Sequence, residues 1–210
     1  MMRKKPMLAY PVSDKPIDYS KPVFIQPKLD GVRCLIQCDV TKNDLVTWYK
    51  ITAYSRTGKE WKNIDHILNE LKPFFEKYPD VILDGELYNH DLRDNFEKII
   101  SLVRKTKPKP EDRQESAGMV QFHCYDTVDE TLTFEERNRF IEQNVLRSHC
   151  VYHVNTVPVY DDEHARALHK VNLDNGYEGS IVRTNDPYQC KRSHNLRKFK
   201  DFSDAEAVIV

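Results

Sequence analysis

The chain is organised around the stretch Phe24-Ile25-Gln26-Pro27-Lys28-Leu29-Asp30-Gly31-Val32-Arg33. The β-branched and aromatic side chains of residues 22–25 favour an extended strand, and the Asp-Gly pair favours a tight turn. We therefore expect a hairpin in which residues 32–37 form the second strand. This arrangement puts Lys28 at a strand end, where a ligand can approach its ammonium group.

The length and composition of the chain limit its possible size class, partners and cellular location. At 210 residues, with 40% apolar and 31% charged side chains, the chain can build one large domain or two small ones. A net charge of −1 gives no global attraction to nucleic acid, so any such binding must be local. The sequence lacks a membrane-spanning apolar run and a signal-like N-terminus, and we expect a cytoplasmic protein. Five cysteines without a Cys-x-x-Cys pair argue against a disulfide framework or a structural zinc site.

Charged residues recur where a strand is expected. Asp84 and Glu86 interrupt the apolar run 81–88, where charges are costly unless they bind something. Glu178 precedes the expected strand 179–184, and a carboxylate at a strand mouth suits Mg²⁺. Lys198 and Lys200 alternate along 196–200 and face the same side, so they repel each other unless an anion lies between them.

The Lys-x-Asp-Gly-x-Arg pattern at Lys28 resembles the active-site motif of the covalent nucleotidyltransferases, which comprise ATP-dependent DNA ligases, RNA ligases and mRNA capping enzymes. In that family the lysine attacks the α-phosphate of a nucleoside triphosphate and becomes joined to the nucleotide by a P–N bond. An amine must be uncharged to attack, so such a site must disfavour the ammonium form by desolvation or neighbouring cations.

Further motifs follow in the family's order, and the resemblance implies a role for each. Ser55-Arg56-Thr57-Gly58 implies that Arg56 contacts ribose and phosphate, as a planar fork of donors can. Asp84-Gly85-Glu86-Leu87 implies that Glu86 meets the ribose or a metal-bound water, with Asp84 in support. Tyr125 is the expected platform for the adenine base, with Phe122 as the alternative. Asp30 is expected to hold Lys28 and Arg33 and to assist the 3′-hydroxyl of the substrate.

We expect four sets of site residues. The catalytic residues are Lys28, Asp30, Arg33, Lys198 and Lys200. The nucleotide-binding residues are Gln26, Pro27, Lys28, Arg33, Arg56, Glu86, Tyr125, Ile181, Lys198 and Lys200. Glu178 and Glu86 are the metal ligands, and Lys191 and Arg192 the DNA contacts.

Among the members of this family, the continuation Asp204-Ala205-Glu206-Ala207 is similar to the DNA ligases. The 27 residues before Lys28 are too few for the domain that binds a nicotinamide nucleotide, so the resemblance implies ATP as the nucleotide donor, with Mg²⁺ or Mn²⁺. It also implies the minimal ligase type of viruses, phages and some bacteria, acting as a monomer on nicked duplex DNA. The expected location is cytoplasmic, or nuclear for a virus of a eukaryotic host. The alternatives are an RNA ligase, a GTP-using capping enzyme and a catalytically silent nucleic-acid binding module.

The expected fold is α+β, with two largely antiparallel β-sheets flanked by helices and a nucleotide groove between the sheets, as in the covalent nucleotidyltransferase (ATP-grasp-like) fold. Residues 1–203 form the adenylation domain in this interpretation, beginning with an extended arm over 1–21, and residues 204–210 begin an OB-fold domain with a strand over 206–210. Periodicity predicts helices over 64–78, 91–105, 134–146 and 161–173, and a mobile loop over 105–117.

Overall fold

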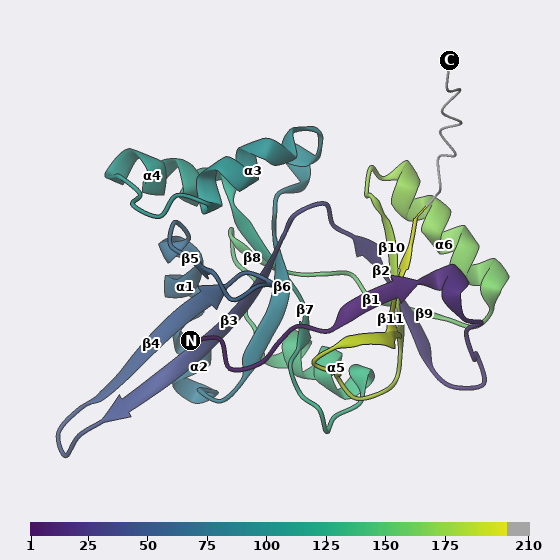
Figure 1. Cartoon of the computed structure of the whole chain (residues 1–210), viewed down its shortest axis with the longest axis horizontal. Helices are drawn as coiled ribbons and strands as arrows, with labels where there is room; N and C mark the ends of the chain where they lie inside the picture. Colours follow the sequence, from purple (N-terminus) through teal and green to yellow (C-terminus); the bar gives the residue numbers. More distant parts are fainter. Residues whose placement is uncertain (201–210) are drawn as a thin grey trace.

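The computed structural model describes residues 1–200, whose strands form two sheets (Figure 1). One sheet has five strands, in the order β1 (Leu8–Pro11), β11 (Arg192–Phe199), β10 (Gly179–Thr184), β2 (Val23–Lys28) and β9 (Val157–Val159). The other has six, in the order β5 (Glu60–Trp61), β4 (Thr47–Tyr54), β3 (Val32–Lys42), β6 (Ile82–Tyr88), β7 (Gln121–Thr127) and β8 (Val151–His153). Apart from the parallel pairs β1–β11 and β7–β8, neighbouring strands are antiparallel, and the predicted α+β class is confirmed.

Helices cover the outer faces of both sheets (Figure 1). They are α1 (Asp65–Glu70), α2 (Lys72–Lys77), α3 (Phe96–Val103), α4 (Pro110–Met119), α5 (Phe134–Asn144) and α6 (Asp162–Asp174), with 3₁₀ turns at Val12–Asp14 and His90–Asn95. The larger core lies between the six-stranded sheet and α1, α2, α3 and α5, and includes Ile67, Phe75 and Ile141. A smaller core packs Ala165 of α6 against Ile25 and Val182 of the five-stranded sheet.

The predicted hairpin at Lys28 is wrong, because β2 and β3 belong to different sheets. Leu29 is buried between the sheets beside Tyr88 and Val154, and the chain crosses from one sheet to the other over residues 29–31. Gly31 makes this crossing possible, because a Cβ atom there would lie 2.5 Å from the carbonyl oxygen of Leu87. Lys28 is still the last residue of its strand, as predicted, but it stands at the junction of the two sheets.

One helix prediction, one loop prediction and the predicted N-terminal arm also need correction. The predicted helix 64–78 is divided at Leu71, since Pro73 cannot donate the backbone hydrogen bond of a continuous helix. The predicted loop 105–117 contains α4, which Pro110 begins and whose Asp112 carboxylate accepts from the Lys109 backbone N–H at 2.8 Å. The arm is not merely extended, because β1 adds to the edge of the five-stranded sheet. The predicted strand 206–210 lies outside the described residues.

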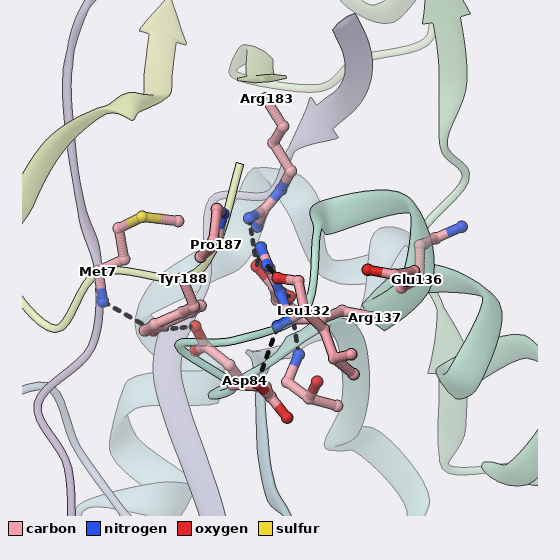
Figure 2. A network of polar contacts seen from close by, with 12 residues as sticks. Met7, Asp84, Leu132, Glu136, Arg137, Arg183, Pro187 and Tyr188 are labelled. Atoms are coloured by element: carbon pink, nitrogen blue, oxygen red, sulfur yellow. Dashed lines mark hydrogen bonds and ion pairs between the residues drawn. The ribbon is translucent and has the colours of Figure 1, made fainter. Parts of the chain in front are cut away.

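Buried carboxylates tie the two sheets together (Figure 2). Asp126 on β7 accepts from Arg183 on β10 at 2.6 Å and from Arg137 on α5 at 2.7 Å. Asp84 on β6 accepts from the hydroxyl of Tyr188 at 2.7 Å, and this residue lies between β10 and β11. Both carboxylates have no exposed surface, so each is compensated by hydrogen-bonded partners rather than by water.

Asp126→Asn should lower the free energy of unfolding by about 3–5 kcal/mol, because it leaves Arg137 and Arg183 buried without their counter-charge. Urea denaturation followed by circular dichroism measures this change. The matched control is Glu135→Gln, which removes an exposed ion pair with Arg139 and should cost less than about 0.5 kcal/mol. Equal losses in the two variants would contradict the prediction.

Candidate active site

A cavity of about 340 Å³ lies between the two sheets, beside the crossing at Lys28. Strands of both sheets line it, together with Leu8 and Ala9 of the N-terminal arm. Every residue predicted to bind the nucleotide lines this cavity, namely Gln26, Pro27, Lys28, Arg33, Arg56, Glu86, Tyr125, Ile181, Lys198 and Lys200. The arm residues were not predicted, because their sequence carries no charge or motif that marks a site.

Lys28 and Lys200 share one carboxylate, that of Glu178. The ammonium group of Lys28 donates to one oxygen of Glu178, and that of Lys200 donates to the other. The backbone places the first pair, because Lys28 of β2 lies opposite Gly179 of β10, directly after Glu178. Burial alone would raise the pKa of Glu178, but the hydrogen bonds from Lys200 and Lys28 lower it below its ordinary value. Glu178 is therefore an ionised carboxylate between two cations at the cavity wall.

Lys198 and Lys200 both line the cavity, as does Leu196, which precedes Lys198 by two residues on β11. The predicted alternation that puts Lys198 and Lys200 on one side is thus confirmed. Arg192 lines the cavity as well, and its Nη1 donates to the carbonyl of Ala9 at 2.5 Å. Lys191 is exposed and does not line the cavity, so the two predicted DNA contacts have different surroundings.

Arg33 is held by Asp84 and not, as predicted, by Asp30. Its Nε and Nη2 atoms donate to the two oxygens of Asp84, both at 2.6 Å, and Nη2 also donates to the carbonyl of Met7 at 3.1 Å. Asp84 and Arg33 lie on the adjacent strands β6 and β3, with Asp84 buried, whereas Asp30 is exposed in the crossing. The predicted support of Glu86 by Asp84 is thus replaced by a two-pronged contact that fixes Arg33.

Glu86 is a carboxylate whose charge depends on pH in the neutral range. Burial raises the pKa of Glu86 from 4.5 to about 7, although Arg33 and Lys28 nearby act in the opposite direction. The hydroxyl of Tyr125 donates to Oε2 of Glu86 at 3.2 Å. Burial raises the pKa of the Tyr125 hydroxyl as well, so it keeps its proton and remains a donor.

Tyr125, rather than the alternative Phe122, is the aromatic residue at the cavity. Phe122 is fully buried in the larger core, on the other face of β7. The guanidinium carbons of Arg33 and Arg183 lie over the Tyr125 ring, 5.2 Å and 5.4 Å from its centroid. The ring is thus held in place from both sheets.

Arg183 lines the cavity but was not among the predicted site residues. Its Nε donates to Oε1 of Gln26 at 2.6 Å, and both side chains are 2% exposed. The available signal was the arginine itself, since a charge in the apolar strand 179–184 requires a buried partner. The charged partner, Asp126, comes from β7 of the other sheet and could not be named from the sequence.

Arg56 stands at the boundary between this cavity and a second one of about 590 Å³. Lys59 and Arg104 line the second cavity, and within residues 1–200 none of these three side chains has an acidic partner. The two cavities share Arg33, Arg56 and Glu86, so an anion in the second cavity would adjoin a ligand in the first.

Solved structures share this architecture. A structure from a study of Lig E DNA ligases aligns with 95% of this chain and 70% of its own, with a TM-score of 0.70 and 18% identity. The adenylate form of Chlorella virus DNA ligase aligns with 94% of this chain and 67% of its own, with a TM-score of 0.65 and 22% identity. The fold is that of a nucleotidyltransferase domain.

Comparison of the amino-acid sequence with known proteins identifies the family within this fold class. Residues 6–200 match the family model described as the ATP dependent DNA ligase domain. A DNA ligase of African swine fever virus, from a pig isolate, is 28% identical over 204 residues, covering 92% of this chain and 45% of that protein. The DNA ligase of a tick isolate of the same virus is 30% identical over 171 residues, or 76% of this chain and 39% of that protein. The chain belongs to the ATP-dependent DNA ligase domain family, and it spans less than half the length of these relatives.

The raised pKa of Glu86 links stability to pH. A folded-state pKa of about 7 against an ordinary 4.5 means that the folded protein holds a proton that the unfolded chain has released. The stabilisation from Glu86 is therefore complete below about pH 4.5 and is lost as the pH rises to about 7. Glu86→Gln, which cannot ionise, should show a smaller fall in melting temperature between pH 5 and pH 7.5 than the wild-type chain. Parallel pH profiles for the two proteins would contradict this assignment.

Proposed function

We propose that the cavity binds ATP and that Lys28 becomes covalently linked to AMP. The observation that carries this proposal is the placement of Lys28 and Lys200 on one carboxylate, Glu178, at a cavity that Arg56, Glu86 and Lys198 also border. The Lys28 ammonium first releases a proton to solvent, and its nitrogen then forms a bond to the α-phosphorus. The bond from that phosphorus to the bridging oxygen of pyrophosphate breaks, pyrophosphate leaves, and the nitrogen releases a second proton. Lys198, Lys200 and Arg56 stabilise the charge that develops on the phosphate oxygens. Membership of the ATP-dependent DNA ligase domain family supports ATP as the donor.

The remaining cavity residues have positioning roles in this proposal. Glu86 and Arg56 engage the ribose, and the Tyr125 ring packs on the base. Arg33, fixed by Asp84, contacts the nucleotide from the six-stranded sheet. Pro27 and Ile181, on neighbouring strands of the other sheet, border the base. In this arrangement the two sheets hold opposite sides of the nucleotide.

Glu178 and Glu86 are the proposed ligands of Mg²⁺ or Mn²⁺. Carboxylate oxygens suit these hard cations, and Mg²⁺ in nucleotide sites takes one or two carboxylates and completes its coordination with phosphate oxygens and water. The described residues hold no group of three or more His, Cys, Asp and Glu that could bind a metal unaided, so this division of ligands fits the site. The metal ion, when bound, would neutralise charge on the phosphates. Glu178 engaged by a cation would release Lys28 from its ion pair.

We propose that AMP then passes from Lys28 to the 5′-phosphate at a DNA nick and that the 3′-hydroxyl displaces it. The relatives' name, DNA ligase, supports this substrate. The unpaired cations of the second cavity, Lys59 and Arg104, suit the phosphates of the accepting strand. Asp30, exposed at the crossing, is proposed to assist the 3′-hydroxyl, and Lys191 and Arg192 to contact DNA phosphates.

We further propose that residues 1–203 form the adenylation domain and that the protein acts as a monomer in the cytoplasm, or in the nucleus for a virus of a eukaryotic host. The predicted start of an OB-fold domain, 204–210, lies outside the described residues. Within residues 1–200, no helix is long and apolar enough to span a bilayer.

Lys28→Ala should abolish covalent labelling by α-labelled ATP and Mg²⁺, because the variant lacks the attacking amine. The readout is acid-labile label on the gel-purified chain, with mass spectrometry locating the AMP adduct. Lys21→Ala, at an exposed lysine away from the cavity, is the matched control and should label like the wild-type chain. Labelling that persists in Lys28→Ala would exclude Lys28 as the nucleophile, and transfer from GTP in place of ATP would favour a capping enzyme.

Glu178→Gln should lower the rate of lysyl-AMP formation at least about tenfold and raise the Mg²⁺ concentration for half-maximal rate, since an amide is a weaker ligand for a hard cation than a carboxylate. A Mg²⁺ titration of labelling rates measures both effects. Glu163→Gln, at an exposed position in the first turn of α6, should leave the titration unchanged. An unaltered Mg²⁺ dependence in Glu178→Gln would assign this carboxylate to lysine pairing alone.

A further inference from the structure

The side-chain amide of Gln26 is held at both ends at the cavity wall. Its Oε1 atom accepts from Nε of Arg183 at 2.6 Å, and its Nε2 atom donates to the hydroxyl of Thr156 at 2.8 Å. Nε2 also approaches the carbonyl of Tyr125 at 3.4 Å. With 2% of its surface exposed, Gln26 has little freedom to change rotamer.

Arg183 is itself fixed by contacts outside the cavity. Its Nη1 donates to Asp126 at 2.6 Å, and its guanidinium carbon lies 4.8 Å from the ring centroid of Phe134. Asp126 also accepts from Arg137, so two arginines from different elements converge on one carboxylate. Arg183 lines the cavity, whereas Arg137 does not.

The chemistry of these groups determines which way the amide points. A guanidinium group only donates hydrogen bonds, so the oxygen of Gln26 must face Arg183 and the NH₂ group must face Thr156. A flipped amide would bring N–H groups against the guanidinium and lose the hydrogen bond from Arg183. The second lone pair of Oε1 and the weakly engaged hydrogen of Nε2 therefore keep fixed directions in a side chain that lines the cavity.

We propose that Arg183 is a positioning residue that locks the Gln26 amide and thereby makes the cavity select a 6-aminopurine over a 6-oxopurine. The inference rests on the proposed binding of ATP in this cavity. The amino group of adenine donates where the oxygen of hypoxanthine accepts, so an amide that cannot rotate favours one base and opposes the other. Freed from Arg183, the amide turns to match either base.

The test is equilibrium binding of ATP and of ITP to the full chain, measured by dialysis, which needs no covalent step. ITP differs from ATP in the purine ring by the 6-oxo group and the accompanying N1 hydrogen. The wild-type chain should bind ATP at least about tenfold more tightly than ITP. Arg183→Lys, which keeps the charge beside Asp126 but loses the Nε donor, should reduce this ratio at least about fivefold.

Arg137→Lys is the matched control, because it alters the same buried carboxylate without touching the cavity. It should change the ATP-to-ITP ratio less than about twofold, even where the melting temperature falls as far as in Arg183→Lys. A ratio depends on neither the fraction of folded protein nor its concentration. An unchanged ratio in Arg183→Lys, or an equal loss in Arg137→Lys, would overturn the assignment.

Gln26→Glu tests the contact from the other side and covers the case in which Arg183→Lys does not fold. A carboxylate still accepts from Nε of Arg183 but cannot donate to Thr156. If Arg183 is the anchor, the preference for ATP should remain or increase, and a collapse of the preference would assign the anchoring to Thr156 instead. Equal binding of ATP and ITP by the wild-type chain would overturn this inference alone, whereas binding of neither would overturn the proposed function with it.

Discussion

The contact between Arg183 and Asp126 is the constraint on which the arrangement of the two sheets depends. It joins β10 of one sheet to β7 of the other with both side chains buried, and Arg137 completes the charge balance from α5. A buried ion pair contributes little net stability, since desolvation offsets most of its attraction. Its geometry is nevertheless specific, because breaking it exposes uncompensated charges to an apolar surrounding. The network therefore acts mainly to fix how the sheets face each other.

The position of Lys28 follows from that constraint. The chain leaves the five-stranded sheet at Lys28 and enters the six-stranded sheet at Val32, through a crossing with Leu29 buried and Gly31 against the backbone of Leu87. A lysine at the strand end that precedes such a crossing has both sheets within reach of its side chain. One sheet supplies Glu178 and the other supplies Glu86, so the same few residues define both the junction and the cavity.

The cavity separates two electrostatic environments. On the five-stranded side, Glu178 is ionised between Lys28 and Lys200. On the six-stranded side, Glu86 is half-buried and desolvation raises its pKa to about 7, so it changes charge near neutral pH. Chemically identical groups thus differ because one has two ammonium partners and the other is mainly desolvated. Near a bound nucleotide, Glu178 would always offset part of the lysine charge, whereas Glu86 would add negative charge only above about pH 7.

The sequence by itself determined the residue types of the site and the class of the fold. Short motifs in a fixed order carry that information locally, and the residues they predicted for nucleotide binding all line one cavity. Only the tertiary structure decided how those motifs meet. A hairpin and a crossing between sheets share the same local Asp-Gly signal, and the outcome at residues 29–31 was set by the burial of Leu29. The partners of Arg33 and Arg183 were likewise beyond prediction, because each is chosen by strand register and sheet packing. A residue's neighbours across a sheet or between sheets depend on the whole fold, whereas its capacity to donate, accept or ionise belongs to the residue alone.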